Sequence, residues 1–230
     1  TKYHLLNYKI INKQFEQALY SLSLFMNENN NRLRPLKINC GLGGKKVGKT
    51  SLLIRYTSGK FPELDIPPVL ENYESVLKNG DVSIDFVLCD WSNDVNSTNS
   101  EFSSLPQSDV VVLMFSVDDR ASFEEIEEYY LPQVEKKCPD AARLLVGTKS
   151  DLRNDLDAIE ELEHDNFTMI NQREAEELAK SIGAAVYIET SAKLNENVTQ
   201  VFETAVEAAL QRLPGMIPKT QQSSSKCLLL

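Results

Sequence analysis

The feature that most constrains this chain is residues 43–50, which read GGKKVGKT and have the spacing GxxxxGK[ST]. A strand-like run, Leu36–Leu42, precedes it, and a helix-like run, Thr50–Ser58, follows it. In this context, successive backbone N–H groups curl around phosphates, and the helix adds the positive end of its dipole. Lys49 then reaches the β- and γ-phosphates, and the Thr50 hydroxyl is a Mg²⁺ ligand. The motif therefore favours a phosphate-binding unit over a surface turn rich in glycine and lysine.

Composition excludes several classes of function. A chain of 230 residues can form one domain with a well-buried core and additional tails. Its net charge of −10 argues against a general nucleic-acid binder and against strong electrostatic attachment to anionic lipid. The four cysteines have neither disulfide-framework nor metal-ligand spacing, which predicts free thiols. No apolar run approaches the roughly 20 residues that span a bilayer.

Strand and helix patterns alternate along most of the chain. The sequence predicts strands at 36–42, 71–78, 82–90, 109–116, 143–147 and 185–189, and helices at 50–58, 122–136, 172–182 and 198–209. Asn79-Gly80 predicts a tight hairpin. This order predicts an α/β fold with a six-stranded, mostly parallel sheet, one antiparallel edge strand and helices on both faces. Ligands bind such sheets at the carboxyl ends of the strands, where the phosphate loop lies.

The predicted domain spans residues 34–213 and is flanked by two tails. Residues 1–33 form an N-terminal extension whose apolar residues show weak periodicity. This extension is either an amphipathic helix that docks on the domain or a membrane, or a loosely ordered segment, and we expect the second. Residues 214–230 are expected to be a flexible C-terminal tail.

Two short motifs and one acidic residue follow predicted strands. Asp90 ends a strand and is either a turn residue or the carboxylate that supports Mg²⁺ from outside its direct ligands in a P-loop protein. In Thr148-Lys149-Ser150-Asp151, Asp151 can accept hydrogen bonds from N1–H and N2–H₂ of guanine, a donor pair that adenine lacks. Lys149 can lay its stem across the ring. In Ser191-Ala192-Lys193, the Ala192 backbone N–H can meet guanine O6. Each motif alone is a weak signal, but their order behind the phosphate loop is specific.

From about Leu36 to its end, the chain resembles the small GTPases of the Ras superfamily, and within them the Rho/Rac family. The resemblance rests on residues 48–50 (GKT), 61–76 (FPELDIPPVLENYESV), 148–155 (TKSDLRND) and 189–193 (ETSAK). It implies a P-loop NTPase G domain that binds GTP or GDP with Mg²⁺ and hydrolyses GTP to GDP and phosphate. The nucleotide-binding residues it implies are Gly43, Lys46, Val47, Gly48, Lys49, Thr50, Ser51, Phe61, Thr148, Lys149, Asp151, Ser191, Ala192 and Lys193, with Thr50 and Asp90 at the metal.

The same resemblance implies several surface features. Phe61 would stack edge-on against the guanine, residues 62–70 would be switch I, and residues 90–104 would be switch II. An acidic stretch at 155–165 matches the Rho-type insert in position, and is also compatible with a solvated charged helix.

The last four residues, Cys227-Leu228-Leu229-Leu230, have the form of a CaaX box with terminal leucine, which predicts geranylgeranylation of Cys227. The alternative is a free apolar tail. Only Lys219 and Lys226 lie nearby, so a single lipid would anchor the protein weakly and exchangeably. We expect it at the cytoplasmic face of the plasma membrane or an endomembrane, exchanging with the cytosol.

Several residues depart from the family pattern where GTP is hydrolysed. Pro68 stands at the switch I threonine position and has neither a hydroxyl nor an N–H. Asn93 replaces a glycine that senses the γ-phosphate, and Asp94 replaces the glutamine that orients the attacking water. An ionised Asp94 cannot donate a hydrogen bond, so no catalytic residue is assigned. Lys45 and Lys46 replace a glycine and an alanine, and Lys45 stands where a partner's arginine finger would enter.

These departures leave two hypotheses. The first is a prenylated Rho/Rac-like GTP-binding signalling protein that hydrolyses GTP very slowly and acts through effectors on the actin cytoskeleton and membranes. Its partners would include exchange factors and a GDP-dissociation-inhibitor-like protein, but no nucleic acid. Leu70 departs from the usual phenylalanine in switch I, so the choice of effector stays open. The alternative is a pseudo-GTPase scaffold that binds nucleotide weakly or not at all. A third class, a metabolic P-loop kinase, would explain the phosphate loop but not the other motifs.

Overall fold

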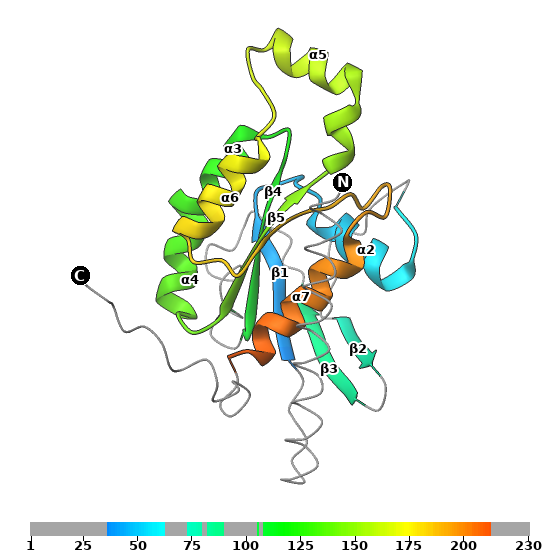
Figure 1. The fold of residues 1–230 in the computed structure, drawn as a ribbon, viewed down its shortest axis with the longest axis vertical. Helices are drawn as coiled ribbons and strands as arrows, with labels where there is room; N and C mark the ends of the chain where they lie inside the picture. Colours follow the sequence, from blue (N-terminus) through cyan, green and yellow to red (C-terminus); the bar gives the residue numbers. More distant parts are fainter. Residues whose placement is uncertain (1–35, 63–72, 80–81, 90–104, 106–107, 213–230) are drawn as a thin grey trace, which may run out of the picture.

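The computed structural model describes residues 36–62, 73–79, 82–89, 105 and 108–212 (Figure 1). Its strands are β1 (Leu36–Gly43), β2 (Tyr73–Asn79), β3 (Val82–Cys89), β4 (Val110–Ser116), β5 (Ala142–Thr148) and β6 (Tyr187–Glu189). Its helices are α2 (Lys49–Ser58), α3 (Arg120–Glu125), η2 (Ile126–Tyr130), α4 (Leu131–Lys137), η3 (Ser150–Asn154), α5 (Leu156–His164), α6 (Gln172–Ser181) and α7 (Val198–Leu210).

The strands form one six-stranded sheet in the order β2-β3-β1-β4-β5-β6. β2 pairs antiparallel with β3, and every other neighbouring pair is parallel. The predicted mostly parallel sheet with one antiparallel edge strand is therefore confirmed. The parallel strands place the carboxyl ends of β1, β4, β5 and β6 at the same edge.

Helices cover both faces of the sheet, with α2 and α7 on one side and α3, α4 and α6 on the other (Figure 1). The sequence of β4 is apolar from Val110 to Phe115, because all of its residues are buried. Val110, Val112 and Met114 belong to the core under α2 and α7. Val111, Leu113 and Phe115 alternate with them and belong to the core under α3 and α6.

The first strand contains a buried polar residue and an irregularity in its pairing. Asn39 is buried, and the pairing of β1 with β4 shifts register between Asn39 and Leu42. At the end of the strand, Gly43 lies so close to β4 that a Cβ atom there would be 2.1 Å from the Met114 carbonyl oxygen. Only glycine fits at this approach, and the chain enters the phosphate loop directly after it.

The helix predicted at 122–136 is present, but it is not uniformly α-helical. The chain from Arg120 to Lys137 is helical, but its middle segment, η2, is a π-helix. Pro132 lies in the first turn of α4 and cannot donate to a carbonyl of the preceding turn. The wider π turn directly before Pro132 accommodates this missing donor. The spacing of apolar residues alone does not reveal such a turn.

The acidic stretch predicted at 155–165 contains α5, which stands away from the rest of the domain (Figure 1). The side chain of Asp155 caps its first turn by accepting from the Ala158 N–H at 3.3 Å. No residue of α5 is buried. Among the described helices, none has the length and apolarity needed to cross a bilayer.

Candidate functional site

The phosphate loop lies between β1 and α2 and is anchored by one apolar side chain. Val47 is buried in the core, while Lys45 and Lys46 are exposed. Lys46 and Gly48 both have left-handed backbone, with φ of 62° and 94°. Lys49 is 7% exposed, and its Nζ donates to the carbonyl oxygens of Gly43 and Gly44, at 2.7 and 2.8 Å. The lysine ammonium is thus held inside the curl of the loop.

The start of α2 is suited to an anion. Its N-cap, Gly48, provides no side-chain hydrogen bond, and its first turn holds no acidic residue. The first N–H groups of the helix and the positive end of its dipole therefore have no carboxylate of the first turn to compete with a phosphate.

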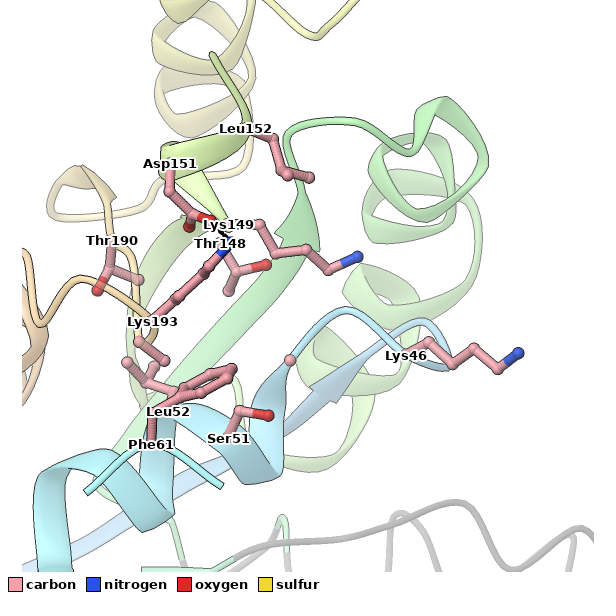
Figure 2. A pocket seen from close by; sticks show the side chains of 12 residues that line it. Lys46, Ser51, Leu52, Phe61, Thr148, Lys149, Asp151, Leu152, Thr190 and Lys193 are labelled. Atoms are coloured by element: carbon pink, nitrogen blue, oxygen red, sulfur yellow. Dashed lines mark ion pairs between the residues drawn. The ribbon is translucent and has the colours of Figure 1, made fainter. Parts of the chain in front are cut away.

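A cavity of about 270 Å³ opens beside this loop, at the carboxyl ends of β1, β5 and β6 (Figure 2). Three segments that are distant in sequence contribute its walls: the loop with α2, the end of β5 with η3, and the loop after β6. The lining residues are Lys46, Gly48, Ser51, Leu52, Phe61, Thr148, Lys149, Asp151, Leu152, Thr190, Ala192 and Lys193. In Figure 2, the Lys46 side chain extends away from the other lining residues.

The Asp151 carboxylate is held in place from the loop after β6. Ser191 Oγ donates to Asp151 Oδ1 at 2.6 Å, and the Leu194 N–H donates to that same Oγ at 3.0 Å. Lys193 Nζ lies 4.0 Å from Asp151 Oδ2. The Asp151 side chain is only 12% exposed, so its orientation toward the cavity is largely determined by these contacts.

Lys149 has a partner that sequence reasoning missed. Its backbone is left-handed, with φ of 57°, and its Nζ lies 3.6 Å from Asp118 Oδ1. Asp118 also accepts a hydrogen bond from the Ser116 hydroxyl. The signal was present in the sequence, because Asp118 follows β4 at the same carboxyl edge as the two motifs.

Thr148 links the phosphate loop to the sheet. Its buried hydroxyl contacts the Val47 carbonyl oxygen, and the Phe115 carbonyl oxygen at 2.9 Å. Val47 belongs to the loop and Phe115 to β4, so one side chain on β5 holds the two together. The sequence identified Thr148 as part of a motif but did not reveal this role.

The cavity brings together many of the predicted nucleotide-binding residues. Those that line it are Lys46, Gly48, Ser51, Phe61, Thr148, Lys149, Asp151, Ala192 and Lys193, and sequence reasoning missed Leu52, Leu152 and Thr190. Those that support the site without lining it are Gly43, Val47, Lys49, Thr50 and Ser191. The other residues that the sequence analysis singled out, at the metal, in the switches and at the lipidation site, lie outside the described residues: Pro68, Leu70, Asp90, Asn93, Asp94 and Cys227.

Of the two residues predicted at the metal, the structure describes Thr50 but not Asp90. Thr50 is the second residue of α2, directly after the phosphate loop, and is half-buried. β3 ends at Cys89, and Asp90 lies outside the described residues. Within the part of the chain that is described, no group of three or more His, Cys, Asp or Glu side chains could hold a metal ion.

The sheet order and the loops at its carboxyl edge define a P-loop GTPase fold, and comparison with known proteins agrees. The Ras family model matches residues 40–211. GTP-binding protein rho5 of Schizosaccharomyces pombe is 39% identical over 190 residues, covering 82% of this chain and 94% of that protein. GTP-binding protein Rho1 of Kluyveromyces lactis is 36% identical over 191 residues, covering 82% and 92%. The chain belongs to the Rho family of small GTP-binding proteins.

The role of Thr148 can be tested by Thr148→Val, which keeps the shape and removes the hydroxyl. The single hydroxyl hydrogen that the two buried carbonyl oxygens share is then lost, so we expect the free energy of unfolding to fall by about 1–3 kcal/mol. Urea unfolding monitored by circular dichroism measures it. The control is Thr57→Val, which removes an exposed hydroxyl bonded to the Leu53 carbonyl and should change stability by less than about 0.5 kcal/mol. Equal effects of the two substitutions would show that Thr148 has no special structural role.

Proposed function

We propose that this chain binds GTP and GDP and acts as a Rho-like signalling protein whose GTP-bound state persists because hydrolysis is very slow. The observation that carries the proposal is the meeting, at one cavity, of the phosphate loop with the two loops that contain Asp151 and Ala192. A phosphate-binding enzyme of another class would need only the first of these elements.

Base recognition follows from the orientation of Asp151. One carboxylate oxygen accepts from Ser191, and the carboxylate retains acceptor capacity for N1–H and N2–H₂ of guanine. Phe61 and the Lys149 stem line the same cavity and provide surfaces for the ring. The Ala192 backbone N–H is the proposed donor to guanine O6. An adenine ring would leave the half-buried carboxylate without its paired donors.

The phosphates would lie against the loop that ends at Lys49. The Lys49 ammonium already lies within the loop, and the α2 N-terminus adds backbone donors. Thr50 and Asp90 are the proposed holders of Mg²⁺, which supplies charge neutralisation at the β- and γ-phosphates when bound.

Slow hydrolysis is proposed from the residues near the γ-phosphate. Asp94 stands where the family has a water-orienting glutamine, and Pro68 where it has a threonine. Lys45 occupies the family's glycine position and is exposed on the loop, where a partner's arginine would have to enter. Loss of arginine-finger stimulation forfeits up to about 10⁵-fold in rate.

Attachment to membranes and choice of partners complete the proposal. A geranylgeranyl group on Cys227, with few basic residues beside it, would give weak and exchangeable anchoring at a cytoplasmic membrane face. In the GTP-bound state the protein would engage effectors of the actin cytoskeleton and membrane signalling. Exchange factors and a GDP-dissociation-inhibitor-like protein are the proposed regulators.

The first test is the nucleotide carried by the purified full-length protein. Denaturation followed by ion-exchange chromatography identifies and quantifies what is released, with and without Mg²⁺ during purification. We expect about one GTP per chain in the presence of Mg²⁺, because slow hydrolysis leaves it unconverted. Absence of guanine nucleotide under both conditions would favour the pseudo-GTPase scaffold.

Hydrolysis itself is expected to be slow and little stimulated by Rho-type activating proteins. Single-turnover release of phosphate from preloaded GTP measures both quantities. The double variant Lys45→Gly with Asp94→Gln restores the entry path and a water-orienting side chain, so it should hydrolyse GTP faster and respond more to an activating protein. A wild-type rate within about tenfold of an ordinary Rho protein would contradict the proposal.

A further prediction concerns the exposed lysines of the loop. If Lys45 contributes positive charge near the γ-phosphate, Lys45→Gly should weaken GTP binding by about two- to fivefold and leave GDP binding unchanged. Lys136→Ala is the matched control, because Lys136 is an exposed lysine of α4 that does not line the cavity. Equilibrium titration with fluorescent GTP and GDP analogues gives the affinities. Unchanged GTP affinity in Lys45→Gly would mean that the lysine only faces solvent.

A further inference from the structure

We infer that Glu189 is a positioning residue that holds the two base-binding loops together, and that it thereby determines how long a guanine nucleotide stays bound. Its partners are Arg153, Tyr187 and Asn197, and these residues with Glu189 are called the Glu189 lock. None of them lines the cavity. The effect on nucleotide residence rests on the proposed function, whereas the joining of the loops does not.

The central contact is a forked ion pair. Arg153 Nε donates to Glu189 Oε2 at 2.7 Å, and Arg153 Nη2 donates to Glu189 Oε1 at 2.8 Å. Arg153 lies in η3, directly after the segment that carries Lys149 and Asp151, while Glu189 ends β6, directly before the segment that carries Ser191 and Ala192. Both side chains are mostly shielded from water, at 27% and 21% exposed. A forked and shielded pair constrains its two loops far more than a surface pair does.

Tyr187 fixes the same carboxylate from the sheet. Its hydroxyl donates to Glu189 Oε1 at 2.8 Å, and its ring stacks on Phe115 with centroids 6.0 Å apart. Burial, reinforced by the Glu189 carboxylate, raises the pKa of Tyr187 above its ordinary value, so the hydroxyl remains a donor. Gly147 provides the room, because a Cβ there would lie 2.5 Å from the Tyr187 hydroxyl oxygen.

Asn197 closes the second loop onto the backbone of Glu189. Its Nδ2 donates to the Glu189 carbonyl oxygen at 2.8 Å. The residue is the N-cap of α7, yet its side chain makes no capping bond to that helix. The loop is closed further by Thr190 Oγ1, which donates to the Glu196 carbonyl oxygen at 2.7 Å.

The lock lies behind the hydrogen bond that orients the base-binding carboxylate. On the cavity side, Ser191 bonds Asp151; on the outer side, Arg153 bonds Glu189. If the outer pair opens, the two loops can separate, and Asp151 loses its fixed position relative to Ala192. The Glu189 lock therefore acts on the nucleotide indirectly, through Asp151 and Ala192, and is not itself part of the binding surface.

The chain supplies a matched control in Arg120 and Glu174. This pair is also forked, with Arg120 Nη2 at 3.2 Å from Glu174 Oε2, and its side chains are 28% and 35% exposed. It joins α3 to α6, and neither residue lines the cavity. Breaking it removes the same chemistry from a place that does not join the base-binding loops.

The test measures release of a fluorescent GDP analogue from the full-length protein after addition of excess GDP. Arg153→Gln and Glu189→Gln should accelerate release by about tenfold or more, whereas Arg120→Gln should change it by less than about twofold. Melting temperatures show whether the two arginine variants are destabilised alike. Asn197→Ala keeps the ion pair and should give a smaller acceleration in a protein that folds normally. Release from Arg153→Gln within about twofold of wild type, or equal acceleration by Arg120→Gln, would overturn the inference.

A second measurement tests the lock without any nucleotide. Hydrogen–deuterium exchange should rise in both segments 149–154 and 190–197 of Arg153→Gln, and in neither segment of Arg120→Gln. A rise in only one segment, or in none, would overturn the joining of the loops. If wild-type protein does not retain the fluorescent GDP analogue, the proposed function fails, and the exchange result still decides the Glu189 lock.

Discussion

The central strand β4 must be apolar on both faces, and the rest of the structure depends on this constraint. All of its residues are buried, and alternate side chains enter the two cores under α2 with α7 and under α3 with α6. Helices on both faces require crossover connections, which make the neighbouring strands parallel. Parallel strands end at one edge, so the loops after β1, β5 and β6 meet there and enclose the cavity.

At that edge, polar contacts hold the loops together, as apolar packing holds the sheet and its helices together. Thr148 joins the phosphate loop to β4, Ser191 orients Asp151, and Arg153 holds Glu189. Each contact connects segments that are far apart in sequence, and each involves a half-buried or buried side chain. Since an unpaired buried polar group is costly, these contacts fix the loops relative to one another.

The residues that match the Rho-family pattern and the residues that depart from it lie in different parts of the sequence. The residues that surround the cavity carry the motif pattern of Rho-family GTP-binding proteins, and the described structure brings them together. The unusual residues Pro68, Asn93 and Asp94 lie outside the described residues, and Lys45 is exposed on the loop. The proposal of slow hydrolysis therefore rests on residues other than those that line the cavity.

Periodicity and short motifs were sufficient to predict the sheet type, the antiparallel edge and most of the residues that line the cavity. Those features depend on local pattern, because burial on one or both faces sets the spacing of apolar residues, and a phosphate loop requires a fixed run of glycines and a lysine. The π-helical turn before Pro132 was missed because apolar spacing does not distinguish it from an α-helix.

Contacts between distant segments were decided only by the tertiary structure. The contacts of Thr148 with Val47 and of Arg153 with Glu189 have no signature in the local sequence, since each depends on which strand ends lie next to each other. The sequence by itself determined that a guanine-type cavity should form at the carboxyl edge of a parallel sheet. The packing of that sheet decided which side chains would meet behind the cavity and hold its loops together.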